Sequence, residues 1–353
     1  MKNKRSIGRF ALLLCTVFCV SVSAYGEPAM LYTTLDILRP AQVNFLPNTE
    51  SVLIVNNSAV QPANLGHASL SYDGEVERLE VETDSLALFC ISVLADELAN
   101  KDYFRSVYMV LNTMDKNPDF NTIRPLQNTT IKDLCSQYGV DAVIALNRIK
   151  VKDEIEEYVD LDAGAYIGVL EAKYETLWSI HYPNKPEVSS YIFKDSLYWE
   201  TESYVRNNLV KKLPERKNAL IDGAMLVGEN AAKRFTPYWE QEDRYFFNPN
   251  NKQMRQGMDS VYVKKWEPAI LIWKEVLQST SNKRLKAQAA NNIAIAYEVI
   301  GDYSSAVEYA NQSFNLFIST TMPDLELLDR LADYIAELTH RKEEILLLEK
   351  QLL

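Results

Sequence analysis

Histidine is scarce in this sequence, with three residues in 353, and this scarcity limits the chemistry that the chain can perform. His67, His181 and His340 lie far apart, and none has a second histidine four residues away, as a helical zinc site requires. The sequence also lacks the Gly-x-Ser-x-Gly elbow of hydrolases and the glycine-rich loop that binds phosphate groups. We therefore assign no catalytic, metal-binding or cofactor-binding residue, and we expect no cofactor.

Cysteine is almost as rare, with four residues. Cys15 and Cys19 lie in an apolar N-terminal segment, which leaves Cys90 and Cys135 for the rest of the chain. Both occupy the apolar faces of predicted helices, where a buried thiol packs as a small hydrophobic group. Because an exported protein can also pair two cysteines, the sequence leaves a disulfide between Cys90 and Cys135 open.

Basic residues are fewer than acidic ones, with 37 Lys and Arg against 48 Asp and Glu, so the net charge is −11. Four of the basic residues precede the apolar N-terminal segment, and the chain without this segment carries −15. An acidic chain gains little from counterion release on nucleic acid and is repelled by anionic lipids. We expect a protein or peptide partner and no nucleic acid.

Long apolar runs are missing as well. Residues 10–22 are apolar, follow four basic residues and precede small ones, which is the order of a secretory signal peptide. The run is too short to span a bilayer. We predict a signal peptide over residues 1–26, cleaved after Gly26 in preference to Ala24. The mature chain is then expected in the periplasm or associated with the outer membrane, without a transmembrane span, and lipid anchoring stays open.

Strand and helix patterns alternate in the first half of the mature chain. Residues 51–55 have the pattern of a buried strand, "DSLALFCISVLADELAN" that of an amphipathic helix, and "FRSVYMVLN" that of a second strand. Another helix ends at Gly139, a residue suited to a left-handed C-cap, and a strand resumes over residues 143–151. Short connections of this kind imply right-handed crossovers, so we predict an α/β fold with strands 51–55 and 143–151 in one sheet.

After the acidic stretch "KDEIEEYVDLD", which we interpret as a link, the hydrophobic period changes to two. This change predicts an antiparallel hairpin over residues 165–200 beside the parallel strands. A helix over residues 216–234 follows, and the turn residues 248–251 mark a domain boundary. The predicted organisation is an α/β domain with a mixed sheet and flanking helices over residues 31–247, and an all-α helical repeat domain over residues 250–353.

The C-terminal part has the pattern of tetratricopeptide-type helical hairpins, in which small residues lie where two helices approach closely. "NNIAIAYEVIGDYSSAVEYANQSF" matches one hairpin. "WEPAILIWKEVL" repeats its second-helix pattern, with Ala269 and Ala306 separated by 306 − 269 = 37 residues. We predict one complete repeat, one degenerate repeat and a helical cap, with ordinary helical-bundle packing as the alternative. The residues expected to pack the repeat are Trp266, Ala269, Trp273, Ile293, Ala294, Tyr297, Gly301, Tyr303 and Ala306.

The segments "LDILRPAQVNFLPNTESVLIVNNS", "YGVDAVIALNRI", "LYWETES", "FTPYWEQEDRYFF" and "AANNIAIAYEVIGDYSSAVEYA" carry a resemblance that covers almost the whole mature chain. They resemble a family of uncharacterised exported proteins of Bacteroidota. The resemblance implies an N-terminal domain of unknown function and a C-terminal tetratricopeptide repeat tail. The order of strands and helices before the tail is also similar to that of the TolB amino-terminal and curli-secretion lipoprotein families.

These observations favour an exported cell-envelope adaptor that acts through protein–protein interaction, because stacked helical hairpins present a groove for a partner peptide. One alternative is an envelope enzyme acting on glycan or peptide, with Glu200 or Glu240 beside Trp199 or Trp239. A second alternative, which rests on the topological similarity alone, is a subunit of an envelope secretion assembly. The partner, the oligomeric state and any activity of the N-terminal domain stay open.

Overall fold

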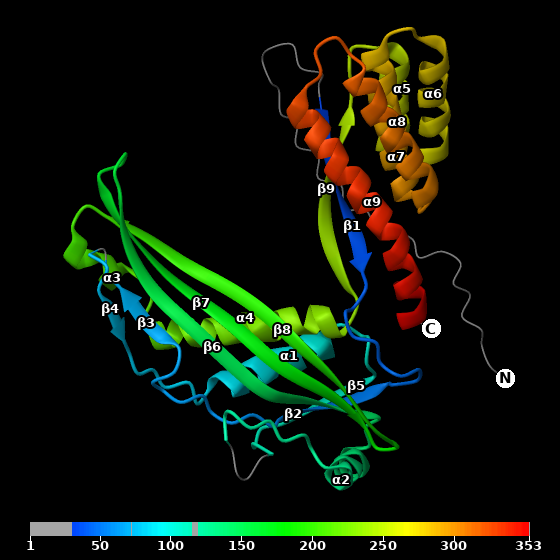
Figure 1. Ribbon diagram of the computed structural model, residues 1–353. Helices are drawn as coiled ribbons and strands as arrows, with labels where there is room; N and C mark the ends of the chain where they lie inside the picture. Colours follow the sequence, from blue (N-terminus) through cyan, green and yellow to red (C-terminus); the bar gives the residue numbers. More distant parts are fainter. Residues whose placement is uncertain (1–29, 72, 115–118, 353) are drawn as a thin grey trace, which may run out of the picture. The chain divides into compact units, whose positions relative to one another are not determined.

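The computed structural model describes most of the chain, namely residues 30–71, 73–114 and 119–352. The signal peptide predicted over residues 1–26 lies outside this described part. The chain divides into two compact units. The central unit spans Ala41–Thr236, and the helical unit consists of the described residues up to Pro40 together with Pro237–Leu353 (Figure 1).

The central unit is built on a seven-stranded mixed sheet, counted over its described residues. Its strands are β2 (Ser51–Asn56), β3 (His67–Leu70), β4 (Val76–Arg78), β5 (Ser106–Val110), β6 (Ala142–Asp160), β7 (Ala165–Tyr182) and β8 (Lys185–Ser203). Its helices are α1 (Leu86–Asn100), α2 (Asn128–Tyr138), the 3-10 turn η1 (Arg206–Asn208), α3 (Leu209–Lys212) and α4 (Arg216–Phe235).

The parallel part of this sheet has β2 in the middle, with β5 on one side and β6 on the other. Leu53 pairs with Val143, which confirms the prediction that these two strands share one sheet. The simplest expectation is that two strands joined by a crossover are neighbours in the sheet. Here β5 and β6 both pair with β2 and not with each other. Gly139 ends α2 in the left-handed conformation, with φ of 66°, as predicted from the sequence.

The strand β6 is much longer than predicted. Its first half pairs with β2, its second half pairs with β3, and β7 pairs with it along nearly its whole length. The acidic stretch that we interpreted as a link is therefore strand. Alternation explains the difference, because Val151, Asp153 and Ile155 are buried while the intervening Lys152 and Glu154 are exposed. Five of the six residues 152–157 are charged, and this density of charge hid the strand signal.

Helices cover the two faces of the sheet to different extents. α1 and α4 pack on one face, and α2 covers part of the other, around Leu53 and Val143. α4 lies so close to α1 that a Cβ on Gly228 would clash with the carbonyl group of Cys90. Cys90 and Cys135 are buried free thiols in two separate cores, and burial raises the pKa of the Cys90 thiol far above its usual value.

The described residues of the helical unit form a two-stranded ribbon and five helices. These elements are β1 (Met30–Arg39), β9 (Tyr238–Phe247), α5 (Lys252–Tyr262), α6 (Trp266–Ser279), α7 (Lys283–Val299), α8 (Tyr303–Ile318) and α9 (Leu325–Gln351). Our sequence-based boundaries placed residues 31–247 in one α/β domain. In the structure, the first and last strands of that range pair with each other, and Leu31, Leu35 and Phe246 share an apolar core with the helices.

Each helix of the helical unit packs on the next one along the chain. Four of these helices begin at a side chain that accepts a hydrogen bond from a backbone N–H three residues later. The capping residues are Asn251, Asn282, Asp302 and Asp324. None of the helices in the described ranges combines the length with the apolar run that a membrane crossing requires.

Candidate functional site

Of the nine residues expected to pack the helical repeat, eight lie on three consecutive helices. Trp266, Ala269 and Trp273 are on α6, Ile293, Ala294 and Tyr297 are on α7, and Tyr303 and Ala306 are on α8, with Gly301 in the turn before α8. Ala294 and Ala306 are fully buried in one cluster, together with Leu338 of α9. Trp266, Ala269, Trp273 and Ile293 belong to a second cluster that also contains residues of the ribbon.

Trp273 joins three elements of this second cluster. Its indole Nε1 donates a hydrogen bond of 3.3 Å to the carbonyl oxygen of Met254 on α5. Its ring stacks on Phe246 of β9, with 5.9 Å between the ring centroids. Gly257 of α5 lies against the indole so closely that a Cβ there would clash with it. Trp273 is therefore held for packing and has no surface left for a ligand.

The ribbon lies against α7. Asn292 of α7 accepts a hydrogen bond of 2.8 Å from the backbone N–H of Phe247 and donates one of 2.8 Å to its carbonyl oxygen. The neighbouring Asn291 donates to the carbonyl oxygen of Tyr245 at 3.1 Å. Both asparagines are almost completely buried. Sequence reasoning missed this contact, although two adjacent asparagines within an alanine-rich helix were the available signal.

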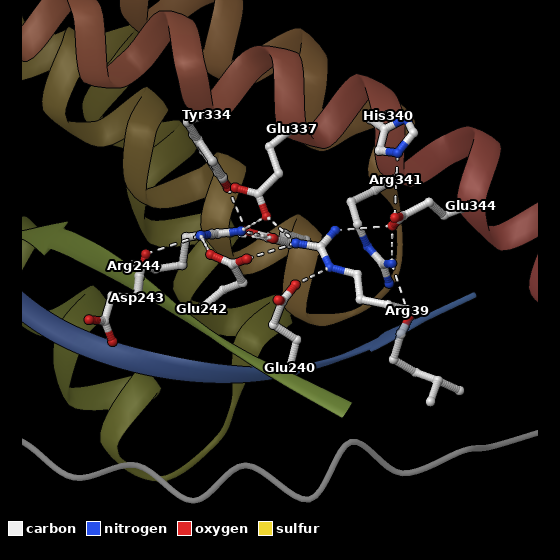
Figure 2. Close-up of polar contacts among 12 residues, drawn as sticks. Arg39, Glu240, Glu242, Asp243, Arg244, Tyr334, Glu337, His340, Arg341 and Glu344 are labelled. Atoms are coloured by element: carbon white, nitrogen blue, oxygen red, sulfur yellow. Dashed lines mark hydrogen bonds and ion pairs between the residues drawn. The ribbon is translucent and has the colours of Figure 1, made fainter. Parts of the chain in front are cut away.

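A cluster of charged side chains fixes the ribbon to α7 and α9 (Figure 2). Its members are Arg39 of β1, Glu240, Glu242 and Arg244 of β9, Glu298 of α7, and Glu337, Arg341 and Glu344 of α9. We call these eight residues the charge cluster. Three guanidinium groups thus face five carboxylates, and most of them are largely withdrawn from water.

Arg244 is the centre of the charge cluster. Its guanidinium donates to Glu298 at 2.9 Å and to Glu337 at 2.6 Å, and its side chain is 7% exposed. The hydroxyl of Tyr334 donates to Glu298 at 2.8 Å. Burial and the negative charge of Glu298 raise the pKa of Tyr334 well above its usual value, so this hydroxyl keeps its proton. The cluster therefore holds its carboxylates in fixed contacts instead of presenting them to a substrate.

In the enzyme alternative, each carboxylate is next in sequence to its aromatic residue. Because side chains alternate along a strand, the two point to opposite faces. Glu240 belongs to the charge cluster, where it accepts a hydrogen bond of 2.7 Å from Arg39, whereas Trp239 is 56% exposed. Trp199 of β8 packs against the apolar cores of the central unit, and Glu200 is exposed on the opposite face of the strand. Neither pairing expected from the sequence places an aromatic ring beside its carboxylate.

A buried polar network lies where β2 ends and β6 bulges, among the parallel strands of the central unit. Asn57 donates to Asn147 at 2.9 Å, and Asn147, which lies at the register shift between β6 and β7, donates to Ser179 at 2.8 Å. The hydroxyl of Ser179 lies 2.7 Å from Nε2 of His181. Burial lowers the pKa of His181, which favours the neutral imidazole that accepts this hydrogen bond.

The pair of Ser179 and His181 has the distance of a nucleophile and its general base. However, Ser179 is 1% exposed and His181 is 4% exposed, so a substrate has no access to the hydroxyl. Asn147 occupies the position next to Ser179 and already donates to it. We assign this network a structural role, which is to fix the bulge of β6 against β7.

A small cavity lies beside the network, between the carboxyl end of β2 and the N-terminus of α1. This is the edge of an open α/β sheet where ligands commonly bind. The lining residues include Asn56, Ser58, Gln61, Thr83, Asp84 and Thr113. Its volume is about 40 Å³, whereas small-molecule sites span roughly 300–1,000 Å³. The cavity therefore fits a water molecule and not a cofactor.

The histidines do not come together in the structure. Nδ1 of the buried His67 bonds Asp153, which in turn accepts a hydrogen bond of 2.8 Å from Arg216. His340 lies 3.5 Å from Glu344 at the margin of the charge cluster. Within the described ranges, no three residues of the types His, Cys, Asp and Glu are arranged to hold a metal ion.

Two family models match the chain. One is described as Domain of unknown function (DUF8603) and matches residues 49–247, and the other is described as Domain of unknown function (DUF6340) and matches residues 255–340. A search of curated proteins finds no match. Among solved structures, the chain is similar to one titled "Crystal structure of uncharacterized protein", with 12% identity and a TM-score of 0.23 over 53% of this chain and 94% of that one. A TM-score this low supports no conclusion about fold or function.

Proposed function

The chain belongs to the family of the domain of unknown function DUF8603, and from this premise and the geometry of its helical unit we propose that it is an exported cell-envelope adaptor protein. In this proposal the helical unit binds a protein or peptide partner. The central unit needs no catalytic activity for this role.

The observation that carries the proposal is the way in which the helical unit holds β9. Asn291 and Asn292 of α7 bond the backbone of an extended segment, and the ring of Phe246 of that segment stacks on Trp266 and on Trp273. Backbone hydrogen bonds together with pockets for side chains are the means by which proteins recognise extended peptides. The surface of the helices thus binds an extended segment, which in this structure is β9 of the same chain.

We interpret α5 with α6 and α7 with α8 as two tetratricopeptide-like hairpins, with α9 as the cap. Support comes from the order of packing, in which each helix contacts the next, and from the burial of Ala294 and Ala306 in one cluster. Proteins of stacked helical hairpins bind partners over an extended surface. Because the ribbon already occupies part of that surface, the partner must bind elsewhere on the unit.

The connection between α8 and α9 is the best candidate surface for the partner. Ile318, Met322 and Leu325 lie within eight residues and are 51%, 88% and 72% exposed. Exposed apolar side chains grouped in this way mark interaction sites more often than scattered ones do. We call these three residues the connection patch.

Affinity purification from envelope fractions tests the proposal. The purified protein serves as bait, and the double variant Met322→Glu and Leu325→Glu serves as the surface probe. Leu161→Glu is the matched control, because Leu161 of the β6–β7 turn is 88% exposed, as Met322 is. We expect one partner to be retained by the wild-type protein and by Leu161→Glu and to be lost from the double variant. Retention by all three proteins would contradict the connection patch, and recovery of no partner by the wild type would contradict the adaptor role.

Export is a separate part of the proposal and has its own test. The order of basic, apolar and small residues over residues 1–26 supports it. Cell fractionation followed by N-terminal sequencing should find the protein in the envelope or periplasm, beginning at Glu27. A chain that keeps Met1 in the cytoplasm would refute export.

A further inference from the structure

One face of the central sheet carries a group of charged side chains on β6, β7 and β8, which lie side by side (Figure 1). This is the face opposite to α1 and α4, beyond the part that α2 covers. The lysines are Lys150, Lys152, Lys173 and Lys194, and the glutamates are Glu154, Glu156, Glu171, Glu175 and Glu200. We call these nine residues the charged face.

The charges are ordered about one row of paired residues. Asp153 of β6 pairs with Ala172 of β7, which pairs with Leu197 of β8. All four lysines lie on one side of this row, and four of the five glutamates lie on the other. The fifth, Glu175, lies among the lysines, where it pairs with Lys150 and Lys194. For every lysine, a glutamate of the same strand lies on the other side of the row, at the same number of residues from it. These pairs are Lys150 with Glu156, Lys152 with Glu154, Lys173 with Glu171, and Lys194 with Glu200.

The same order brings like charges together within one chain. Lys152 pairs directly with Lys173 across β6 and β7, and Glu154 pairs directly with Glu171. Like charges in directly opposite positions destabilise a sheet. Lys173 has a neighbour of opposite sign, Glu171, at 2.7 Å along its own strand. The stability of the isolated sheet therefore does not account for this arrangement of charges.

We propose that the charged face binds the same face of a second copy of the chain. A two-fold axis that runs along the row, in the plane between the copies, relates the two chains. It places each lysine of one copy opposite, in the other copy, the glutamate that lies at the same distance from the row on the same strand. Such a contact is isologous, so every interaction occurs twice. The like charges that repel each other in one chain are then covered by opposite charges of the other chain.

The shape of the charged face suits this symmetry. It is hollowed on both sides of the row, by about 450 Å³ around the lysines and about 280 Å³ around the glutamates. Tyr198 projects from the glutamate side and is 69% exposed. The axis places Tyr198 opposite Ser196, a small residue that lines the hollow of the lysine side in the second copy. The phenol ring of each copy thus has a space to fill.

The experiment measures self-association of the full-length protein by analytical ultracentrifugation at several concentrations, at low and at high salt. We expect the wild type to dimerise and the dimer to weaken as salt rises, because salt screens exposed charges. Two variants each reverse the two charges nearest the row on one side: Lys152→Glu with Lys173→Glu, and Glu154→Lys with Glu171→Lys. Each should self-associate at least about tenfold more weakly than the wild type, since like charges then face each other across the axis.

An equimolar mixture of the two charge-reversed variants gives the decisive result. One variant presents glutamates and the other presents lysines, so the mixture should form a one-to-one heterodimer although each variant alone is monomeric. Failure of the mixture to associate would overturn the proposal, as would a wild type that stays monomeric at low salt.

A neutral variant guards against loss of folding. Lys152→Gln with Lys173→Gln removes the repulsion between these two lysines within the sheet, so its melting temperature should be no lower than that of the wild type while its self-association weakens. Self-association equal to that of the wild type would contradict the proposal. A lower melting temperature would show that the lysines stabilise the fold and would contradict the argument from opposed like charges.

Discussion

The charge cluster of the helical unit and the charged face of the central unit differ in how their charges are placed. The helical unit withdraws Arg39, Arg244 and Glu298 from water and pairs each with partners of opposite sign. The central unit leaves Lys152 and Glu154 exposed and sets each opposite a residue of its own sign. Charges of the first kind fix the fold, because breaking a buried pair leaves an uncompensated charge. Charges of the second kind contribute little to the fold and are available for a partner.

The largest effect in this comparison is expected from Arg244→Met. The change leaves the buried Glu298 without its cation, whereas Glu337 keeps Arg39 at 3.3 Å, and it should reduce the free energy of unfolding by about 3–5 kcal/mol. Urea denaturation measures the loss. The matched control is Arg105→Met, because Arg105 of the central unit is 82% exposed and its replacement should change stability by less than about 0.5 kcal/mol. Equal stabilities of the two variants would remove the contrast between buried and exposed charge.

A somewhat smaller effect is expected from Asn292→Ala. The substitution leaves the N–H and C=O groups of Phe247 buried without partners, at a cost of about 2–4 kcal/mol. Asn311→Ala on the exposed side of α8 is the control and should cost less than about 0.5 kcal/mol. Hydrogen exchange of the Phe247 amide should also become faster in Asn292→Ala. Unchanged protection of that amide would mean that α7 does not hold β9 in solution.

The packing of α7 on α8 gives the next effect. Ala306→Leu inserts methylene groups between helices that meet at Ala294, and should cost roughly 1–3 kcal/mol. Ser304→Gln is the control on the exposed side of α8. We prefer it to a change at Ser305, because the hydroxyl and N–H of Ser305 bond Asp302. If thermal melting of the full chain is the same for both variants, the helices do not dock at Ala306.

The smallest effect concerns pH and the buried His181. Burial lowers its pKa below the ordinary value of 6.5, so the unfolded chain binds a proton at a higher pH than the folded chain does. Stability should therefore fall as the pH drops below about 6.5, where the unfolded imidazole becomes charged. In His181→Gln this contribution should be absent, which makes the loss of stability between neutral and mildly acidic pH smaller than in the wild type. An identical pH dependence of the two proteins would show that His181 is not held neutral.

Sequence reasoning located elements whose signal is local. The strand around Leu53, the C-cap at Gly139 and the hairpin from residue 165 onward follow from hydrophobic period and turn residues, and the structure contains all three. The second half of β6 was missed because its exposed face is charged at every other position. A sequence segment with this many charged residues has the composition of a solvent-exposed linker.

Pairings between distant segments could not be predicted from the sequence. β1 and β9 are both half-buried strands near turn residues, and nothing local distinguishes a strand of the central sheet from a separate ribbon. The charge cluster was equally hidden, because Arg39, Glu298 and Arg341 come from three distant segments. The asparagines of α7 were visible in the sequence, but their partners were not.

The ribbon also determines the order in which the two units can be completed. β1 comes first along the chain, but its register partner for Arg39 is Tyr238, about 200 residues later. The helical unit is therefore a discontinuous domain, and the central unit is an insertion whose two ends are brought together by that pair. During synthesis from the N-terminus, β1 therefore stays unpaired until the whole central unit has been made. The central unit can fold as soon as Thr236 has appeared, whereas the core around Leu31 and Leu35 closes only when β9 and the helices arrive.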